Sequence, residues 1–236
     1  LFIRICIYTQ LYIYLYANIS CMRNIIGPPV SGDDFFGRDQ ELANAWHLLE
    51  NGMSLRISAP RRVGKTSFVR RLHQNCESRD WTGFYVNVED KDNEVGFIEA
   101  LLENLASEKS WSKKLGGKAK DTILSFIKSI ETLKTPAGEL KFKWAHDEKT
   151  LAIQKDIKEL LFTFGEGIII IDELPVLLNR MLKQENGHQR VTDLLHWLRS
   201  LRQLSGVKMY WIFCGSVSLD SFVKRHNLSL TINDTT

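Results

Sequence analysis

Residues 59–67 constrain the fold of this chain more than any other segment. Apolar, β-favouring residues precede the segment and residues 67–74 favour a helix, so a strand, a loop and a helix follow one another. This order, with its Gly-Lys-Thr ending, is typical of a phosphate-binding loop (P-loop), whose backbone N–H groups surround phosphate oxygens. The alternative is a chance Gly-Lys-Thr in a turn. The candidates for nucleotide contact are Ala59, Pro60, Arg61, Arg62, Val63, Gly64, Lys65, Thr66 and Ser67.

Three residues of this segment have separate expected roles. Gly64 lets the backbone approach the phosphates closely, and Lys65 reaches the outer phosphates as a catalytic cation. The Thr66 hydroxyl coordinates the magnesium ion that bridges those phosphates. The segment departs from the common pattern at Ala59, where glycine is usual. Alanine tolerates positive φ poorly, so we expect either a turn with negative φ at Pro60 or backbone strain at Ala59.

A second motif lies at residues 167–173, where a glycine and four isoleucines are followed by Asp172 and Glu173. The apolar run predicts a strand buried on both faces. Ligands of open α/β sheets bind at the carboxyl ends of the strands, so both acids should face the crevice that Lys65 and Thr66 line. We expect Asp172 to hold magnesium through water and Glu173 to act as the general base on an attacking water. The alternative is an ordinary buried strand that ends in a solvated acidic turn.

Four stretches together resemble the AAA+ superfamily of P-loop ATPases, in particular its archaeal-type and STAND-like predicted ATPases. The resemblance covers roughly residues 32–233 and implies a three-layer α/β/α P-loop NTPase fold that binds ATP and Mg²⁺. It also implies that the first stretch lies near the adenine, that Ser216 senses the outer phosphate, and that the protein acts as a homo-oligomer or with a protein partner. The stretches are residues 35–42, 59–67, 168–178 and 212–216.

The resemblance further implies where the P-loop strand lies in the sheet. In this family that strand lies between the strand at residues 210–214 and a final strand, which we expect beyond Thr236 together with a helical lid. Residues 22–236 are therefore predicted to form an incomplete ATPase core whose P-loop strand is an edge with unpaired backbone groups. Arg202 and Arg225 are candidates for the arginine that such lids supply, although surface positions are the favoured interpretation for both.

The remaining apolar periodicity predicts alternating helices and strands, and hence a parallel sheet with helices on both faces. The spacing of residues 189–204 makes His196 and Trp197 packing or surface residues. The predicted helices are residues 39–49, 95–105, 121–133, 149–164 and 189–204, the predicted strands are residues 54–58, 84–88, 167–171 and 210–214, and residues 138–144 form a short strand or hairpin arm.

Composition limits the classes of function. The chain has 236 residues and a formal net charge of +3, which is too small to indicate nucleic-acid binding, although such binding stays open. Four cysteines without a C-x-x-C pair indicate a reduced, cytoplasmic protein. Residues 1–21 fit neither a membrane-spanning helix nor a signal peptide, and we expect them to be an upstream, non-native extension, with an interfacial anchor as the alternative. Membrane association is therefore not expected.

Together these patterns predict an ATP-binding protein that hydrolyses Mg-ATP to drive a conformational switch. A nucleotide-binding module with little or no hydrolysis is the main alternative. Two further alternatives are a fragment that does not fold without additional sequence and a P-loop kinase. The sequence shows no evident acceptor pocket for a kinase.

Overall fold

The computed structural model describes residues 35, 37–107 and 148–236, and there strands alternate with helices. The expected helix at 121–133, the strand or hairpin at 138–144 and the extension at 1–21 lie outside the described residues. The described elements are α2 (Asp39–Glu50), β1 (Leu55–Ser58), α3 (Lys65–Asn75), η2 (Glu77–Arg79), β2 (Thr82–Asn87), α4 (Glu94–Ser107), α7 (Glu148–Thr163), β3 (Glu166–Asp172), α8 (Leu174–Met181), α9 (Gly187–Arg202), β4 (Lys208–Gly215), α10 (Leu219–Arg225) and η3 (Ser229–Thr231).

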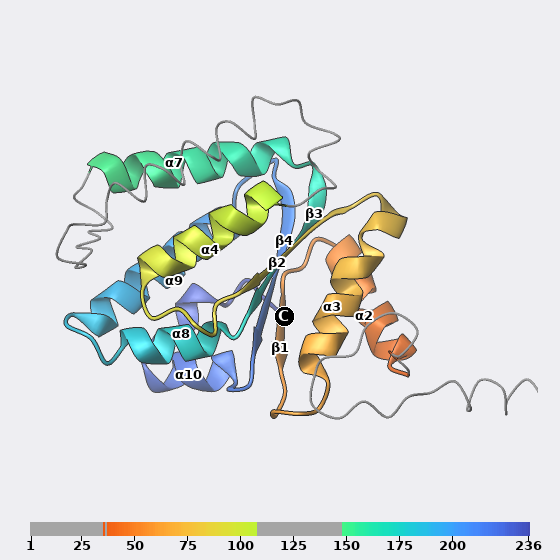
Figure 1. Cartoon of the computed structure of the whole chain (residues 1–236), viewed down its shortest axis with the longest axis horizontal. Helices are drawn as coiled ribbons and strands as arrows, with labels where there is room; N and C mark the ends of the chain where they lie inside the picture. The colour runs from red at the N-terminus through yellow and green to blue at the C-terminus, as the bar shows by residue number, and fades with distance from the viewer. Residues whose placement is uncertain (1–34, 36, 108–147) are drawn as a thin grey trace, which may run out of the picture.

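The strands form one sheet in the order β1-β4-β3-β2, and every neighbouring pair is parallel. Helices α2 and α3 cover one face, and α4, α7, α8, α9 and α10 cover the other (Figure 1). The predicted parallel three-layer α/β/α architecture, which is like that of P-loop NTPases, is therefore confirmed. The predicted pairing of the P-loop strand with the strand at 210–214 is also confirmed, because β1 pairs with β4.

The isoleucine run of β3 explains why the sheet lies in the middle of the molecule. Ile168 and Ile170 pack into the core beneath α2 and α3, whereas Ile169 and Ile171 pack into the larger core on the opposite face. All four side chains are fully buried. Burying each side chain contributes about 1.5–3 kcal/mol to folding. Because two of the side chains pack on each face, β3 stabilises both helical layers.

Two helices were not predicted from the periodicity, namely α8 and α10. Both are short, with 8 and 7 residues. Their local signals are Pro175 in the first turn of α8 and Ser218 at the start of α10, whose side chain accepts a hydrogen bond from the Ser221 N–H. Within the described ranges, no helix is both long and apolar enough to cross a membrane.

The carboxyl-terminal segment runs beside the outer edge of β1. The Thr236 N–H donates to the Ser54 carbonyl at 2.9 Å, and the Arg56 N–H donates to the Thr236 carbonyl at 2.7 Å. Thr235 and Ser54 form a parallel bridge. β1 is the end strand of the four-stranded sheet, as expected, but the prediction that its outer backbone groups are unpaired is wrong at Ser54 and Arg56.

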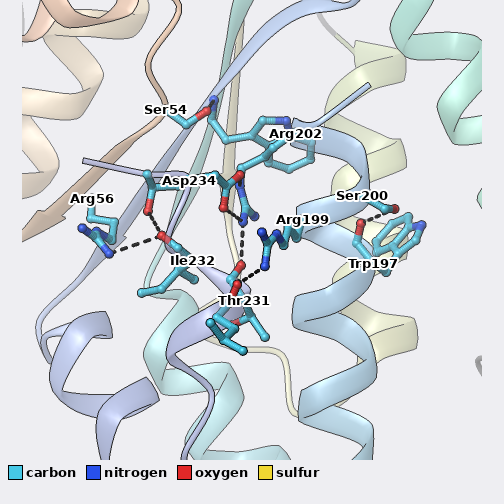
Figure 2. A network of polar contacts seen from close by, with 12 residues as sticks. Ser54, Arg56, Trp197, Arg199, Ser200, Arg202, Thr231, Ile232 and Asp234 are labelled. Carbon is cyan, nitrogen blue, oxygen red and sulfur yellow. Dashed lines mark hydrogen bonds and ion pairs between the residues drawn. The ribbon is translucent and has the colours of Figure 1, made fainter. Parts of the chain in front are cut away.

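Arg202 attaches this segment to α9. Its guanidinium donates to both carboxylate oxygens of Asp234, at 2.9 and 2.8 Å, and to the Thr231 carbonyl at 2.7 Å (Figure 2). The Arg202 side chain is 1% exposed, so its interpretation as a surface charge is wrong. Arg199 donates to the Leu230 carbonyl of the same segment. Two arginines of one helix therefore hold the segment that pairs with β1.

The ion pair of Asp234 with Arg202 should make stability depend on pH. Burial raises the pKa of Asp234, but hydrogen bonding to Arg202 and its charge lower that pKa below its usual value of 3.8. Because the folded-state pKa is depressed, the stabilisation is present above the unfolded-state pKa and is lost as the pH falls through the folded-state value. We expect Asp234→Asn to lower the free energy of unfolding by about 2–3 kcal/mol at pH 7, with a difference from wild type that shrinks below about pH 4.

Urea unfolding at several pH values measures this difference. The matched control is Asp220→Asn, which breaks a more exposed pair with Arg56, whose atoms are 3.0 Å apart. This control should cost less than about 1 kcal/mol. Equal losses for the two variants at pH 7 would contradict a special role of the pair of Asp234 with Arg202.

Candidate nucleotide-binding site

Residues 59–64 form the loop from β1 to α3, and the helix begins at Lys65. Positive φ occurs in this loop at Arg62 (φ 69°) and Gly64 (φ 79°) but not at Ala59. The expected negative φ at Pro60 is therefore compatible with this loop, whereas the alternative of strain at Ala59 is wrong. The residue with unfavourable positive φ is Arg62, because a residue with a Cβ atom adopts the left-handed region only at some cost.

The amino end of α3 is open to an anion. Gly64 occupies the capping position, no side chain caps the helix, and the first turn has no acidic residue. The first N–H groups of a helix lack partners within the helix and carry the positive end of its dipole. This terminus thus offers the donors and the field that a phosphate group needs.

Lys65 and Glu173 form an ion pair at the centre of the site. Lys65 Nζ lies 2.7 Å from Glu173 Oε1, and the two side chains are 6% and 13% exposed. The other oxygen, Oε2, accepts hydrogen bonds from the Ser216 N–H at 2.9 Å and the Ser216 hydroxyl at 3.0 Å. Burial raises the pKa of Glu173, but Lys65 and the Ser216 donors lower it below its usual value. The carboxylate is therefore ionised at neutral pH, and both of its oxygens accept hydrogen bonds.

Asp172 is almost completely buried beside this pair. Its Oδ2 accepts a 2.7 Å hydrogen bond from the Tyr85 hydroxyl and a long one, 3.4 Å, from the Thr66 hydroxyl. Its Oδ1 accepts from the Glu173 N–H at 3.1 Å. Burial and the Asp172 charge raise the pKa of Tyr85, so the tyrosine remains a protonated donor.

The oxygen donors near Asp172 suit a magnesium ion that also has phosphate and water ligands, rather than a metal held by protein side chains alone. No group of three or more histidine, cysteine, aspartate or glutamate side chains that could hold a metal occurs among the described residues. The hydroxyl of Thr66 and the carboxylate of Asp172 are hard oxygen donors, and Mg²⁺ commonly uses one or two such groups together with phosphates and water. The residues present therefore fit an ion that arrives with a nucleotide.

The structure brings together five of the predicted site residues, namely Lys65, Thr66, Asp172, Glu173 and Ser216. The side chains of other predicted residues lie elsewhere. Arg61 is 74% exposed and lies 3.9 Å from Glu89, and Val63 is exposed, whereas Ser67 is buried in α3. Ligand contact by these residues stays a prediction.

Sequence reasoning missed Tyr85. Its position is set by the register of β2 on β3, in which Tyr85 is paired with Ile170, two residues before Asp172. Side chains two residues apart in a strand share a face, so both point toward α3. The available signal was the tyrosine within the predicted strand at 84–88, but only the register identifies its partner.

Arg38 packs against the first turn of α3 and belongs to the stretch that the resemblance places near the adenine. Its guanidinium lies 5.0 Å from the centre of the Phe68 ring, and Phe68 belongs to the first turn of α3. The expected adenine contact stays a prediction.

Comparison with known proteins gives one informative similarity. No known protein-family model matches the chain. The chain is 28% identical over 162 residues to a protein of Methanocaldococcus jannaschii named as an uncharacterized ATP-binding protein. The match covers 64% of this chain and 42% of that relative, so the chain spans less than half of the relative's length.

The partly buried pair of Lys65 and Glu173 should be energetically coupled in the nucleotide-free protein. We expect a double-mutant cycle of Lys65→Met and Glu173→Gln to give a coupling energy of about 1–2 kcal/mol, because each single change leaves a poorly solvated charge without its partner. Denaturant unfolding of the four proteins measures this energy. The control cycle is Lys155→Met with Glu159→Gln, an exposed pair on α7 whose atoms lie 3.6 Å apart. Its coupling should be only about 0.3–0.5 kcal/mol, and equal couplings would contradict the prediction.

Proposed function

We propose that this chain binds ATP with Mg²⁺ at the loop of residues 59–66 and hydrolyses it to drive a conformational switch. The observation that carries the proposal is the convergence of Lys65, Thr66, Asp172, Glu173 and Ser216 beside the open amino end of α3. The name of the Methanocaldococcus jannaschii relative supports ATP as the ligand.

Nucleotide binding would exchange the partner of Lys65. In this structure its ammonium group lies 2.7 Å from Glu173 Oε1. The outer phosphates carry more negative charge than one carboxylate, and the backbone N–H groups of the loop bind them as well. Lys65 is therefore expected to turn to the phosphates, which releases Oε1 of Glu173. Phosphate binding and the freeing of the base are one event in this proposal.

Thr66 and Asp172 would hold the magnesium ion, Thr66 directly and Asp172 through water. When bound, the ion neutralises negative charge that develops on the phosphates. The distance between the two side chains supports this pairing, because the Thr66 hydroxyl lies 3.4 Å from Asp172 Oδ2.

Glu173 would then act as the general base. Its carboxylate accepts a proton from a water molecule, whose oxygen forms a bond to the outer phosphorus of ATP while the bond from that phosphorus to the bridging oxygen breaks. The products are ADP and phosphate. Ser216 donates two hydrogen bonds to Glu173. A movement of the carboxylate would therefore change the contacts of Ser216.

The link to a conformational switch rests on contacts just behind Glu173 and Ser216. Helix α8 follows Glu173 directly, and a Cβ atom at Gly215 would lie 2.6 Å from Pro175 of that helix. The end of β4 thus lies close against the start of α8. In this proposal, a shift of Glu173 or of Ser216 would displace that helix. A homo-oligomer or a protein partner, both implied by the AAA+ resemblance, would receive this motion.

A second candidate function is a nucleotide-binding module with little hydrolysis. The observation in its favour is the engagement of both Glu173 oxygens, by Lys65 and by Ser216. A carboxylate that keeps these partners after nucleotide binding is not free to accept a proton.

Binding of a fluorescent ATP analogue and release of phosphate from ATP test both candidates. We expect Lys65→Ala to weaken Mg-dependent binding by at least about tenfold, because a charge-assisted contact to phosphate is lost. Glu173→Gln should retain binding and slow phosphate release by about 100-fold or more. Lys208→Ala, an exposed lysine at the start of β4, is the control and should change neither quantity.

Unchanged binding by Lys65→Ala would reject the phosphate site. Retained binding together with equal, very slow phosphate release by wild type and Glu173→Gln would select the binding module over the ATPase.

A further inference from the structure

Tyr85 makes the shortest hydrogen bond to the carboxylate that would hold magnesium. Its hydroxyl lies 2.7 Å from Asp172 Oδ2, compared with 3.4 Å for the hydroxyl of Thr66 on the same oxygen. Hydrogen bonds to an ionised carboxylate are stronger than those between neutral groups. Tyr85 therefore contributes more than Thr66 to the orientation of Oδ2.

The tyrosine ring is held by three elements. Its backbone belongs to β2, paired in register with β3, and its side chain packs partly buried against the core beneath α2 and α3. The guanidinium of Arg70 lies 5.4 Å from the ring centre. Arg70 follows Thr66 by four residues on α3, one helical turn later, so the helix that carries Thr66 also covers Tyr85. The register of β2 and the packing of the ring against α3 thus direct the hydroxyl toward Asp172.

Coordination of a metal would leave Tyr85 in place as a donor to Oδ2. The Thr66 hydroxyl would coordinate the ion through its oxygen and could still donate its hydrogen, but its 3.4 Å contact with Oδ2 is the longer of the two. Tyr85 therefore stays the closer hydroxyl on Oδ2 among the described residues. The Glu173 N–H holds only the other oxygen, Oδ1.

We propose that Tyr85 is a positioning residue, which fixes the Asp172 carboxylate in the orientation that receives the magnesium ion of a bound nucleotide. This inference rests on the proposed function. Groups that orient a metal-binding side chain typically change metal affinity by 10–100-fold when they are removed. Tyr85 does not touch the nucleotide phosphates in this proposal, so its effect should be confined to the metal-dependent part of binding.

The test separates metal from nucleotide. The dissociation constant of a fluorescent, non-hydrolysable ATP analogue is measured in EDTA and at increasing Mg²⁺ for wild type, Tyr85→Phe and Tyr210→Phe. Tyr210→Phe is the matched control, since it removes a hydroxyl from a partly buried tyrosine of the same core, near Gly52. For Tyr85→Phe we expect an affinity in EDTA within about twofold of wild type and a half-saturating Mg²⁺ concentration raised about tenfold. Tyr210→Phe should leave both values unchanged.

Each result bears on the inference. The same Mg²⁺ dependence in Tyr85→Phe and wild type would overturn it while leaving the nucleotide site intact. Equal loss of binding in EDTA and in Mg²⁺ would also overturn it, because Tyr85 would then support the fold of the loop instead of the metal. Absence of analogue binding by folded wild type would overturn the proposed function and this inference together. If Tyr85→Phe has a lower melting temperature than wild type, binding is measured below that temperature. The affinity in Mg²⁺ is then compared with the affinity in EDTA for the same protein.

Discussion

The parallel pairing of the strands is the constraint on which the rest of this structure depends. Because β1, β3 and β4 point the same way, their carboxyl ends meet at one edge of the sheet. The chain continues from these three ends into the 59–64 loop, Glu173 and Ser216. Residues separated by more than a hundred positions in the sequence, such as Lys65 and Glu173, thereby come within 2.7 Å. A reversed strand would remove its contribution from the edge altogether.

The acidic groups at this edge are hydrogen-bonded within the protein. Glu173 is bound by Lys65 and Ser216, and Asp172 is bound by Tyr85 and Thr66, so each acid has donors from two other elements. A buried acid without such partners would favour its neutral form or destabilise the fold. Two of these donors, Lys65 and Thr66, are also the groups that the proposed function assigns to phosphate and metal. In that proposal, binding of a ligand would replace contacts that these two side chains make within the protein.

The sequence was informative where a signal is local. The isoleucine run before Asp172 and the Gly-Lys-Thr of the loop identify two strand ends of a parallel sheet, and the described helices with clear periodicity were predicted. Contacts that depend on register or on distant partners were not predictable. Tyr85 reaches Asp172 only through the alignment of β2 with β3, and Arg202 is buried by an aspartate 32 positions later. Nothing near Arg202 in the sequence distinguishes it from a solvated helix charge.

The carboxyl-terminal segment covers part of the outer edge of β1. It is bound to α9 through Arg202 and to β1 through the backbone of Thr236, and only residues 57 and 58 separate Arg56 from the start of the loop. β1 therefore has backbone partners on both sides, β4 on one and the carboxyl-terminal segment on the other. Without that segment the Ser54 carbonyl and the Arg56 N–H would lose these partners, and the strand that leads into the loop at residues 59–64 would have an open outer edge.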